Sequence, residues 1–265
     1  MRHIRRHRPV LAALRPVVFS LTSRITAGLL AGSAMMSPMR FLFVGDSMTI
    51  GSAGGYSWRY RMWQHLVSTG EPFEIVGPRC ALYDIDANAP VSHAYADPAF
   101  PAEARRHLAG WGEGWLHMAP LIREAVASER ADVLLVSLGL IDLGFYTNSD
   151  QTAANAREFI ARARLANPHV RMVLLPVIPN IRAESDAPFA AECARFNVLL
   201  AKAVADLDTP ASPILLASRP DSYDIHSDTY DGTHPGPTGE IKLAGAFATA
   251  MHQAWGLGGA YAVAA

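Results

Sequence analysis

The stretch RFLFVGDSMT, residues 40–49, joins an apolar run to a short polar segment. Residues 41–44 are all apolar, which is typical of a strand buried on both faces of a parallel sheet. A Gly-Asp-Ser segment follows directly, at the point where a chain leaving such a strand turns into a helix. Ser47 is therefore predicted to lie at the carboxyl end of a buried strand.

Four further apolar runs are separated by amphipathic segments, in which apolar residues such as Trp58, Met62 and Leu66 recur at helical spacing. This alternation predicts an α/β fold with three α/β/α layers and a five-stranded parallel sheet. The domain is expected to span residues 39–258, followed by a tail at 259–265. The four further predicted strands are 73–77, 132–139, 171–178 and 213–218.

Loops at the carboxyl ends of parallel strands form the ligand crevice of such folds. The chemistry is therefore expected in the segments that follow the first, third, fourth and fifth predicted strands. These segments are GDSMTIGSAGG (45–55), GLIDLGFYTNSD (139–150), PNIRAESD (179–186) and YDGTHP (230–235).

The composition limits the classes of partner. The chain has 265 residues, half of them hydrophobic, and a net charge of −1, which argues against nucleic acid and favours a small-molecule ligand. No segment after the N-terminal region approaches the ~18 uncharged apolar residues of a membrane span. Cys80 and Cys193 have no metal-ligand spacing, so no metal site is expected, and a single bridge between them stays open.

The first 38 residues differ from the rest, because they are rich in arginine and contain no acidic residue. Arg15 and Arg24 interrupt the apolar run that a secretory signal requires. We interpret residues 1–38 as an N-terminal extension, either an overextended start or a signal-like segment. A cytoplasmic location is expected, with secretion as the alternative.

The segment DGTHP, residues 231–235, places Asp231 three residues before His234. In a turn, such a carboxylate can hold one ring nitrogen of the histidine while the other nitrogen acts as a base. Taken alone, the same residues also suit a turn-capping aspartate and a surface histidine. Ser47, likewise, would suit a helix N-cap.

The blocks FVGDSMT (43–49) and YDGTHP (230–235) resemble the first and last sequence blocks of the SGNH, or GDSL, family of serine hydrolases. The order of serine first and Asp-x-x-His last is also similar, over roughly residues 39–255. The resemblance implies a flavodoxin-like SGNH hydrolase fold and an esterase without a cofactor. It implies that Ser47 is the nucleophile that forms an acyl-enzyme, His234 its base and Asp231 the partner that orients the base.

The family also has an oxyanion hole, which the resemblance assigns to the N–H groups of Ser47 and of a glycine, together with an asparagine amide. Gly112 matches the glycine best, with Gly110 and Gly114 as rivals. In GLID (139–142), however, Ile141 stands where the family has its asparagine. Two amides on crevice loops are candidates to replace it: Asn148 and Asn180.

Several residues are expected to contact the substrate beside the triad. They are Asp46, Trp111, Ile141 and Asn148, with Trp58, Trp63, Trp115 and Tyr56 as further aromatic candidates that suit the core equally. The departure at Ile141 keeps a second function open, an acyltransferase or eliminating enzyme that uses the same triad on a biosynthetic intermediate. A non-catalytic binding relative is a third reading. The oligomeric state stays undetermined.

Overall fold

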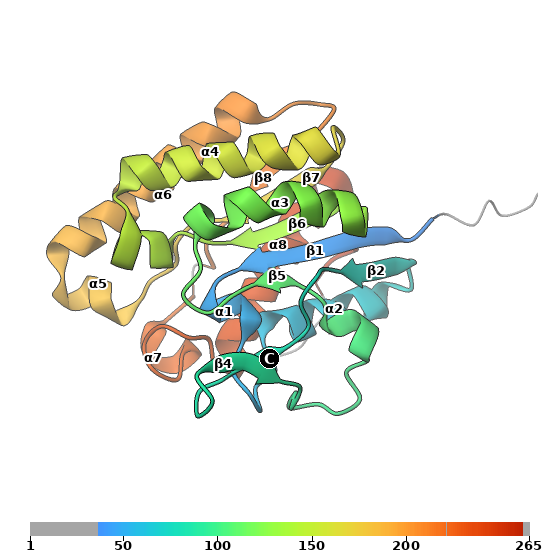
Figure 1. The fold of residues 1–265 in the computed structure, drawn as a ribbon, viewed down its shortest axis with the longest axis horizontal. Helices are drawn as coiled ribbons and strands as arrows, with labels where there is room; N and C mark the ends of the chain where they lie inside the picture. Colours follow the sequence, from blue (N-terminus) through green and yellow to red (C-terminus); the bar gives the residue numbers. More distant parts are fainter. Residues whose placement is uncertain (1–36, 221, 262–265) are drawn as a thin grey trace, which may run out of the picture. The chain divides into compact units, whose positions relative to one another are not determined.

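The computed structural model describes residues 37–220 and 222–261, coloured along the chain in Figure 1. Apart from residues 37 and 38, the expected N-terminal extension lies outside the described residues, and so does the end of the expected tail. Tyr261, within that tail, lies against His65 with a ring-centroid distance of 5.1 Å.

No helix in the described ranges is long and apolar enough to cross a membrane. Cys80 and Cys193 are both free.

A parallel sheet forms the centre of the domain, with the strand order β2-β1-β6-β7-β8. This is the flavodoxin-like order 2-1-3-4-5 when these five strands are counted along the chain. The strands are β1 (Met39–Gly45), β2 (Phe73–Val76), β6 (Val133–Ser137), β7 (Arg171–Leu175) and β8 (Ile214–Leu216). The predicted fold class and all five predicted strands are confirmed, although β6, β7 and β8 are shorter than their apolar runs.

Three short strands escaped the sequence prediction. β5 (Leu108–Ala109) pairs in parallel with the end of β1, so the sheet has six strands in the described part of the chain. β3 (Leu82–Asp84) and β4 (Ala89–Ser92) form a separate antiparallel hairpin. Strands of two to four residues are too short to display a periodic pattern.

Helices cover both faces of the sheet (Figure 1). One face carries α3 (Trp115–Glu129), α4 (Ser149–Ala166) and α6 (Ala187–Leu207), which pack side by side. The other carries α2 (Trp58–Thr69) and α8 (Pro237–Trp255), which contact each other. The remaining helical turns are α1 (Ser47–Ile50), η1 (Ala102–Arg105), η2 (Asp142–Tyr146), α5 (Ile181–Ser185) and α7 (Ile225–Asp228).

Two of the aromatic candidates belong to the core. Trp58 is fully buried and stacks on Phe247 of α8, with a ring-centroid distance of 4.7 Å. Trp115 is also fully buried and meets Phe159 of α4 edge-on at 5.1 Å. Their large apolar surfaces hold the helix layers to the sheet, so neither ring is available to a substrate.

The strand order reverses between β1 and β6, because the chain continues from β1 to β2 on one side and reaches β6 on the other. Such a switch point opens a crevice at the carboxyl ends of the strands. The loops that begin after Gly45 and after Ser137 flank this position. The sheet topology therefore brings Ser47 and the GLID segment to one place.

Candidate active site

Ser47 is the first residue of α1, two residues after β1 ends. Asp46 caps this one-turn helix, since its Oδ1 accepts the N–H of Met48 at 3.0 Å. The cap fixes the helix start and so sets the position of the Ser47 side chain at the carboxyl edge of the sheet.

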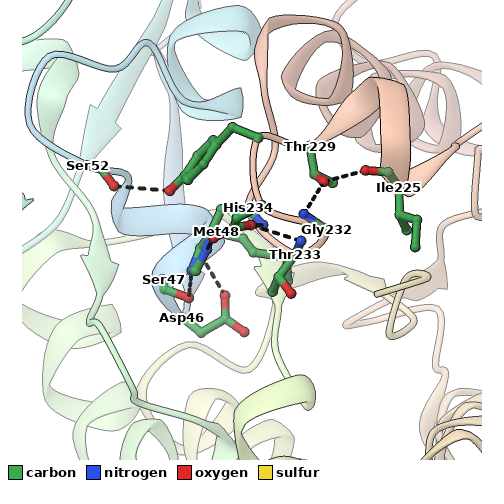
Figure 2. A network of polar contacts seen from close by, with 11 residues as sticks. Asp46, Ser47, Met48, Ser52, Ile225, Thr229, Gly232, Thr233 and His234 are labelled. Carbon is green, nitrogen blue, oxygen red and sulfur yellow. Dashed lines mark hydrogen bonds and ion pairs between the residues drawn. The ribbon is translucent and has the colours of Figure 1, made fainter. Parts of the chain in front are cut away.

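His234 joins Ser47 to Asp231. Figure 2 shows His234 beside Ser47. The Nδ1 atom of His234 lies 2.7 Å from Oδ2 of Asp231, and its Nε2 atom lies 2.9 Å from Oγ of Ser47. A carboxylate only accepts hydrogen bonds, so Nδ1 carries the proton and Nε2 accepts from the Ser47 hydroxyl. The structure brings all three expected triad residues together in the order that nucleophile activation requires.

Asp231 stays ionised in this arrangement. Partial burial raises its pKa, but hydrogen bonds from the backbone N–H and ring of His234 and from the N–H of Thr233 outweigh burial, so the pKa is lowered overall. The two backbone bonds measure 2.7 Å and 2.9 Å. A carboxylate held in this way fixes the imidazole and stabilises its protonated form.

The turn that carries Asp231 and His234 is closed by its own backbone and tied to α5. The N–H of Tyr230 donates to the carbonyl oxygen of His234 at 3.1 Å, and the N–H of Ile181 donates to that of Gly232 at 2.7 Å. Gly232 has a φ of 83°, in the left-handed region that favours glycine. The turn therefore depends on a residue without a side chain at this position.

We expect Gly232→Ala to destabilise the protein by more than the matched variant Gly54→Ala. Both glycines have a positive φ, but a Cβ at Gly232 would lie 2.5 Å from Cβ of Ile181, whereas a Cβ at Gly54 meets nothing within 4 Å. The left-handed conformation costs each variant about 1–2 kcal/mol, and the clash adds ~1–3 kcal/mol at Gly232. Urea unfolding measures both. An equal decrease in unfolding free energy in the two variants would show that the turn moves away from Ile181 without losing stability.

An aromatic stack supports the histidine. The rings of Trp111 and His234 lie 4.8 Å apart at 16°, and those of Tyr230 and His234 lie 5.6 Å apart at 13°. Tyr83, from the hairpin, stacks on Trp111 at 4.4 Å. Trp111, which was expected to contact the substrate, lines the cavity beside Ser47, and its ring also packs against two neighbours. Its main contact in the site is with the imidazole.

A cavity of about 360 Å³ opens beside Ser47 and His234. Two residues expected to bind substrate do not line it. Asp46 is fully buried as the cap of α1, and Asn148 is the cap of α4, where its Oδ1 accepts the N–H of Gln151 at 2.9 Å. The lining residues are Ser47, Trp111, Gly112, Leu140, Ile141, Gly144, Phe145, Asn180, Arg182, Phe189, Asp231, Thr233 and His234.

Two backbone N–H groups are available as oxyanion donors. Within the described part of the chain, the N–H groups of Ser47 and Gly112 donate no hydrogen bond, and both residues line the cavity. The N–H groups of the two rival glycines already donate hydrogen bonds. That of Gly110 donates to the carbonyl oxygen of Gly45 at 3.1 Å, and that of Gly114 donates to Nδ1 of His117 at 3.1 Å. The geometry therefore favours Gly112.

Of the two asparagine candidates for the missing amide at position 141, only Asn180 reaches the cavity. Asn148 lies outside the cavity. Asn180 reaches the cavity wall, but its Oδ1 accepts the N–H of Ala183 at 3.1 Å and its Nδ2 faces the carbonyl oxygen of Ile178 at 3.4 Å. Oδ1 therefore caps α5, whereas Nδ2 has two hydrogens and uses one for the bond to Ile178, so Asn180 stays a candidate for the third donor. Ile141 itself lines the cavity and presents an apolar side chain there.

Asp142, next to Ile141, anchors the loop after β6. Its two carboxylate oxygens accept the N–H groups of Trp115 and Leu116 at 2.8 Å and 3.0 Å, at the start of α3. Burial raises its pKa, although these two bonds act in the opposite direction. Asp142 is thus a helix cap that positions Ile141.

Asp46 carries a second buried carboxyl group close to the nucleophile. Burial raises its pKa to about 7, the bond from Met48 opposes the shift, and the negative charge of Asp142 adds to it. Its Oδ2 has no hydrogen-bond partner within the described residues. The folded protein therefore favours the protonated form of Asp46 more than an exposed aspartate does.

The pKa of Asp46 predicts a pH dependence of stability. A raised pKa means that the folded state loses stability as the pH rises from about 4, the ordinary carboxyl range, through about 7. Asp46→Asn keeps the acceptor for Met48 and cannot ionise. We expect the unfolding free energy of the variant, relative to the wild type, to increase between pH 5 and pH 8. Urea unfolding at both values measures it, and a difference that stays constant would contradict the assignment.

Sequence reasoning missed several cavity residues. Phe145 and Arg182 lie in the two loops expected at the crevice, but nothing in their spacing distinguished them from their neighbours. Phe189 belongs to α6, outside every segment expected at the crevice, and no sequence signal pointed to it.

Comparison with known proteins identifies the family. The model of the GDSL-like lipase/acylhydrolase family matches residues 43–240. The chain belongs to this family and is a carboxylic ester hydrolase, with a small-molecule ester as its substrate. The family named from the two sequence blocks is confirmed.

Solved structures share the fold at low identity. A carbohydrate esterase family 3 protein from Talaromyces cellulolyticus is 23% identical, with a TM-score of 0.64 over 81% of this chain and 97% of that chain. A family 3 carbohydrate esterase from Clostridium thermocellum is 18% identical, with a TM-score of 0.64 over 82% and 96%. An acetylxylan esterase from Geobacillus stearothermophilus is 14% identical, with a TM-score of 0.59 over 82% and 95%. No curated protein sequence matched.

Proposed function

We propose that the protein hydrolyses carboxylic esters through an acyl-enzyme formed on Ser47. The observation that carries this proposal is the chain of contacts from Oγ of Ser47 through the His234 ring to Asp231, at 2.9 Å and 2.7 Å. Oγ attacks the ester carbonyl while Nε2 of His234 takes the hydroxyl proton. Asp231 holds the imidazolium, which then protonates the departing alcohol.

Water completes the cycle. Nε2 of His234 takes a proton from a water molecule, the hydroxide attacks the acyl carbonyl, and the carboxylic acid leaves as Ser47 regains its proton. The negative charge on the carbonyl oxygen is stabilised in both steps by the N–H groups of Ser47 and Gly112. These residues complete the reaction by themselves, without the chemistry of a cofactor.

The missing asparagine amide lowers the rate that this site can reach. Loss of one oxyanion donor typically costs on the order of 10² to 10³ in kcat. The remaining backbone donors support turnover, since they are fixed by α1 and by the turn at Gly112, which has a φ of 74°. With two oxyanion donors, the protein therefore hydrolyses esters more slowly than an enzyme with three such donors.

Labelling with a fluorophosphonate tests the proposal. The probe phosphonylates a serine only when a base activates it, so we expect the wild-type protein to react and Ser47→Ala and His234→Ala not to react. Ser52→Ala is the matched control, because Ser52 lies nearby but contacts Tyr230 at 3.3 Å rather than the histidine. Labelling that persists in Ser47→Ala would overturn the proposal.

Transfer of the acyl group to an alcohol uses the same intermediate, so the products must be identified. We expect the free acid to dominate when p-nitrophenyl butyrate is incubated in water with added methanol or glycerol. Predominant formation of the new ester would favour an acyltransferase.

A further inference from the structure

The cavity beside Ser47 has two chemically different sides. One side is formed by the turn that carries the triad and by Trp111. The other is apolar and comes from the loop after β6 and from α6, and it contains Leu140, Ile141, Phe145 and Phe189. Phe145 is 74% exposed and lies on η2, whereas Phe189 is buried.

The proposed reaction assigns a substrate group to each side, and the inference rests on that proposed function. The leaving alcohol receives its proton from Nε2 of His234, so it must lie beside the turn at 231–234. The acyl chain then extends away from the imidazole. It is therefore expected to contact the apolar side of the cavity.

Arg182 lies beside this apolar side. Its guanidinium lies over the ring of Phe189 at 4.2 Å, and its Nη1 donates to the carbonyl oxygen of Gly144 at 2.8 Å. Its Nε donates to Asp186 at 3.2 Å, so an ion pair offsets its charge. The planar group thereby joins η2 to α5 and α6, and it lines the cavity.

We infer that the site takes an apolar acyl group longer than acetyl, and that Arg182 sets the longest chain it accepts. Three observations carry the inference. The wall is apolar, position 141 holds isoleucine in place of a polar amide, and the guanidinium of the lining residue Arg182 is held by three contacts. The volume of about 360 Å³ is at the lower end for ligand pockets, which suits a chain of limited length.

A substitution at Gly144 can make the apolar side of the cavity narrower. A Cβ at this position would lie 3.5 Å from Nη1 of Arg182 and 3.9 Å from Cε2 of Phe189, both ordinary contact distances. The added methyl group would occupy space between two lining residues without a clash. Gly144→Ala is therefore a variant that narrows the cavity.

The test compares kcat/KM for p-nitrophenyl acetate, butyrate, hexanoate, octanoate and decanoate. We expect wild-type kcat/KM to rise from acetate to butyrate or hexanoate and to fall for decanoate. Arg182→Ala removes the side chain that limits the length of the acyl chain. The ratio of kcat/KM for decanoate to kcat/KM for butyrate is therefore expected to increase about tenfold, the usual effect of one or two methylenes in an apolar pocket. Gly144→Ala lowers the hexanoate-to-acetate ratio.

Two matched variants separate the steric role of Arg182 from its charge. Arg182→Met keeps the length of the side chain without the charge, and we expect it to retain most of the wild-type limit on chain length. Arg195→Ala removes an exposed arginine paired with Asp150 on the α4 side, outside the cavity, and leaves the profile unchanged.

Three results would overturn the inference. The first is a wild-type kcat/KM that falls at every added carbon from acetate onward. The second is an unchanged profile in Arg182→Ala. The third is a preference for p-nitrophenyl hemisuccinate over butyrate that Arg182→Met abolishes, because Arg182 would then bind a carboxylate. In each case a protein that still requires Ser47 for hydrolysis keeps the proposed function intact, whereas hydrolysis that persists in Ser47→Ala contradicts that function.

Discussion

Ser47→Ala is expected to lower kcat for ester hydrolysis by on the order of 10⁶-fold, the scale measured when a nucleophile is removed from a serine hydrolase triad. Among the hydrogen bonds of the described residues, the hydroxyl of Ser47 is the only one that reaches the His234 ring, at 2.9 Å. Without it, His234 can activate only water. The residual rate then comes from binding and from the backbone oxyanion donors.

The double variant gives the stronger test of this expectation. His234→Ala alone is expected to lose nearly as much as Ser47→Ala, and the combined variant no more than either, because nucleophile and base act as one unit. Initial rates on p-nitrophenyl butyrate measure all three, with circular dichroism as the check on folding. If Ser47→Ala kept about a tenth of the wild-type rate, another residue would have to be the nucleophile.

Ile141→Asn is expected to raise kcat on p-nitrophenyl acetate by up to ~10². Ile141 lies at the family position of the oxyanion amide and lines the cavity beside Ser47 and Gly112. Asn148 lies outside the cavity, and Asn180 is held by bonds to Ala183 and Ile178. The new amide would bind the oxyanion more strongly in the transition state than the carbonyl in the ground state. The gain is therefore expected in kcat rather than in KM.

Ile141→Val is the matched control, since it shortens the side chain without adding a donor. We expect it to leave kcat on acetate nearly unchanged. The gain in Ile141→Asn is expected to shrink for hexanoate, because the substitution also makes the acyl wall more polar. A loss of activity on every ester, with the fold intact, would mean that the apolar contact at position 141 matters more than a third donor.

The sequence was sufficient for five strands of the sheet, because strands buried on both faces have continuous apolar runs. Residues 41–44 and 133–136 are buried throughout, and their runs located β1 and β6. The hairpin β3–β4 was not foreseen, since its short strands are half exposed and carry no pattern. It nevertheless supplies Tyr83, which stacks on Trp111 beside the catalytic turn.

The three expected triad residues could be named because two sequence blocks resemble a family with a fixed order of roles. The walls of the cavity could not be named in this way, since they depend on side chains that tertiary packing brings together. Arg182 and Phe189 come from α5 and α6, and only their contact at 4.2 Å shows that they lie together on the cavity wall. The expected roles of Asp46 and Asn148 failed for a related reason, because both side chains are used as helix caps.

Detection of the acyl-enzyme tests the proposed mechanism most directly. The protein would be mixed with excess p-nitrophenyl butyrate, quenched in acid within milliseconds and digested for mass spectrometry. We expect a burst of p-nitrophenol close to the enzyme concentration if deacylation is the slower step, and a butyryl group on the peptide that contains Ser47. Butyryl groups on a different residue, or steady hydrolysis by Ser47→Ala at the wild-type rate, would contradict the mechanism.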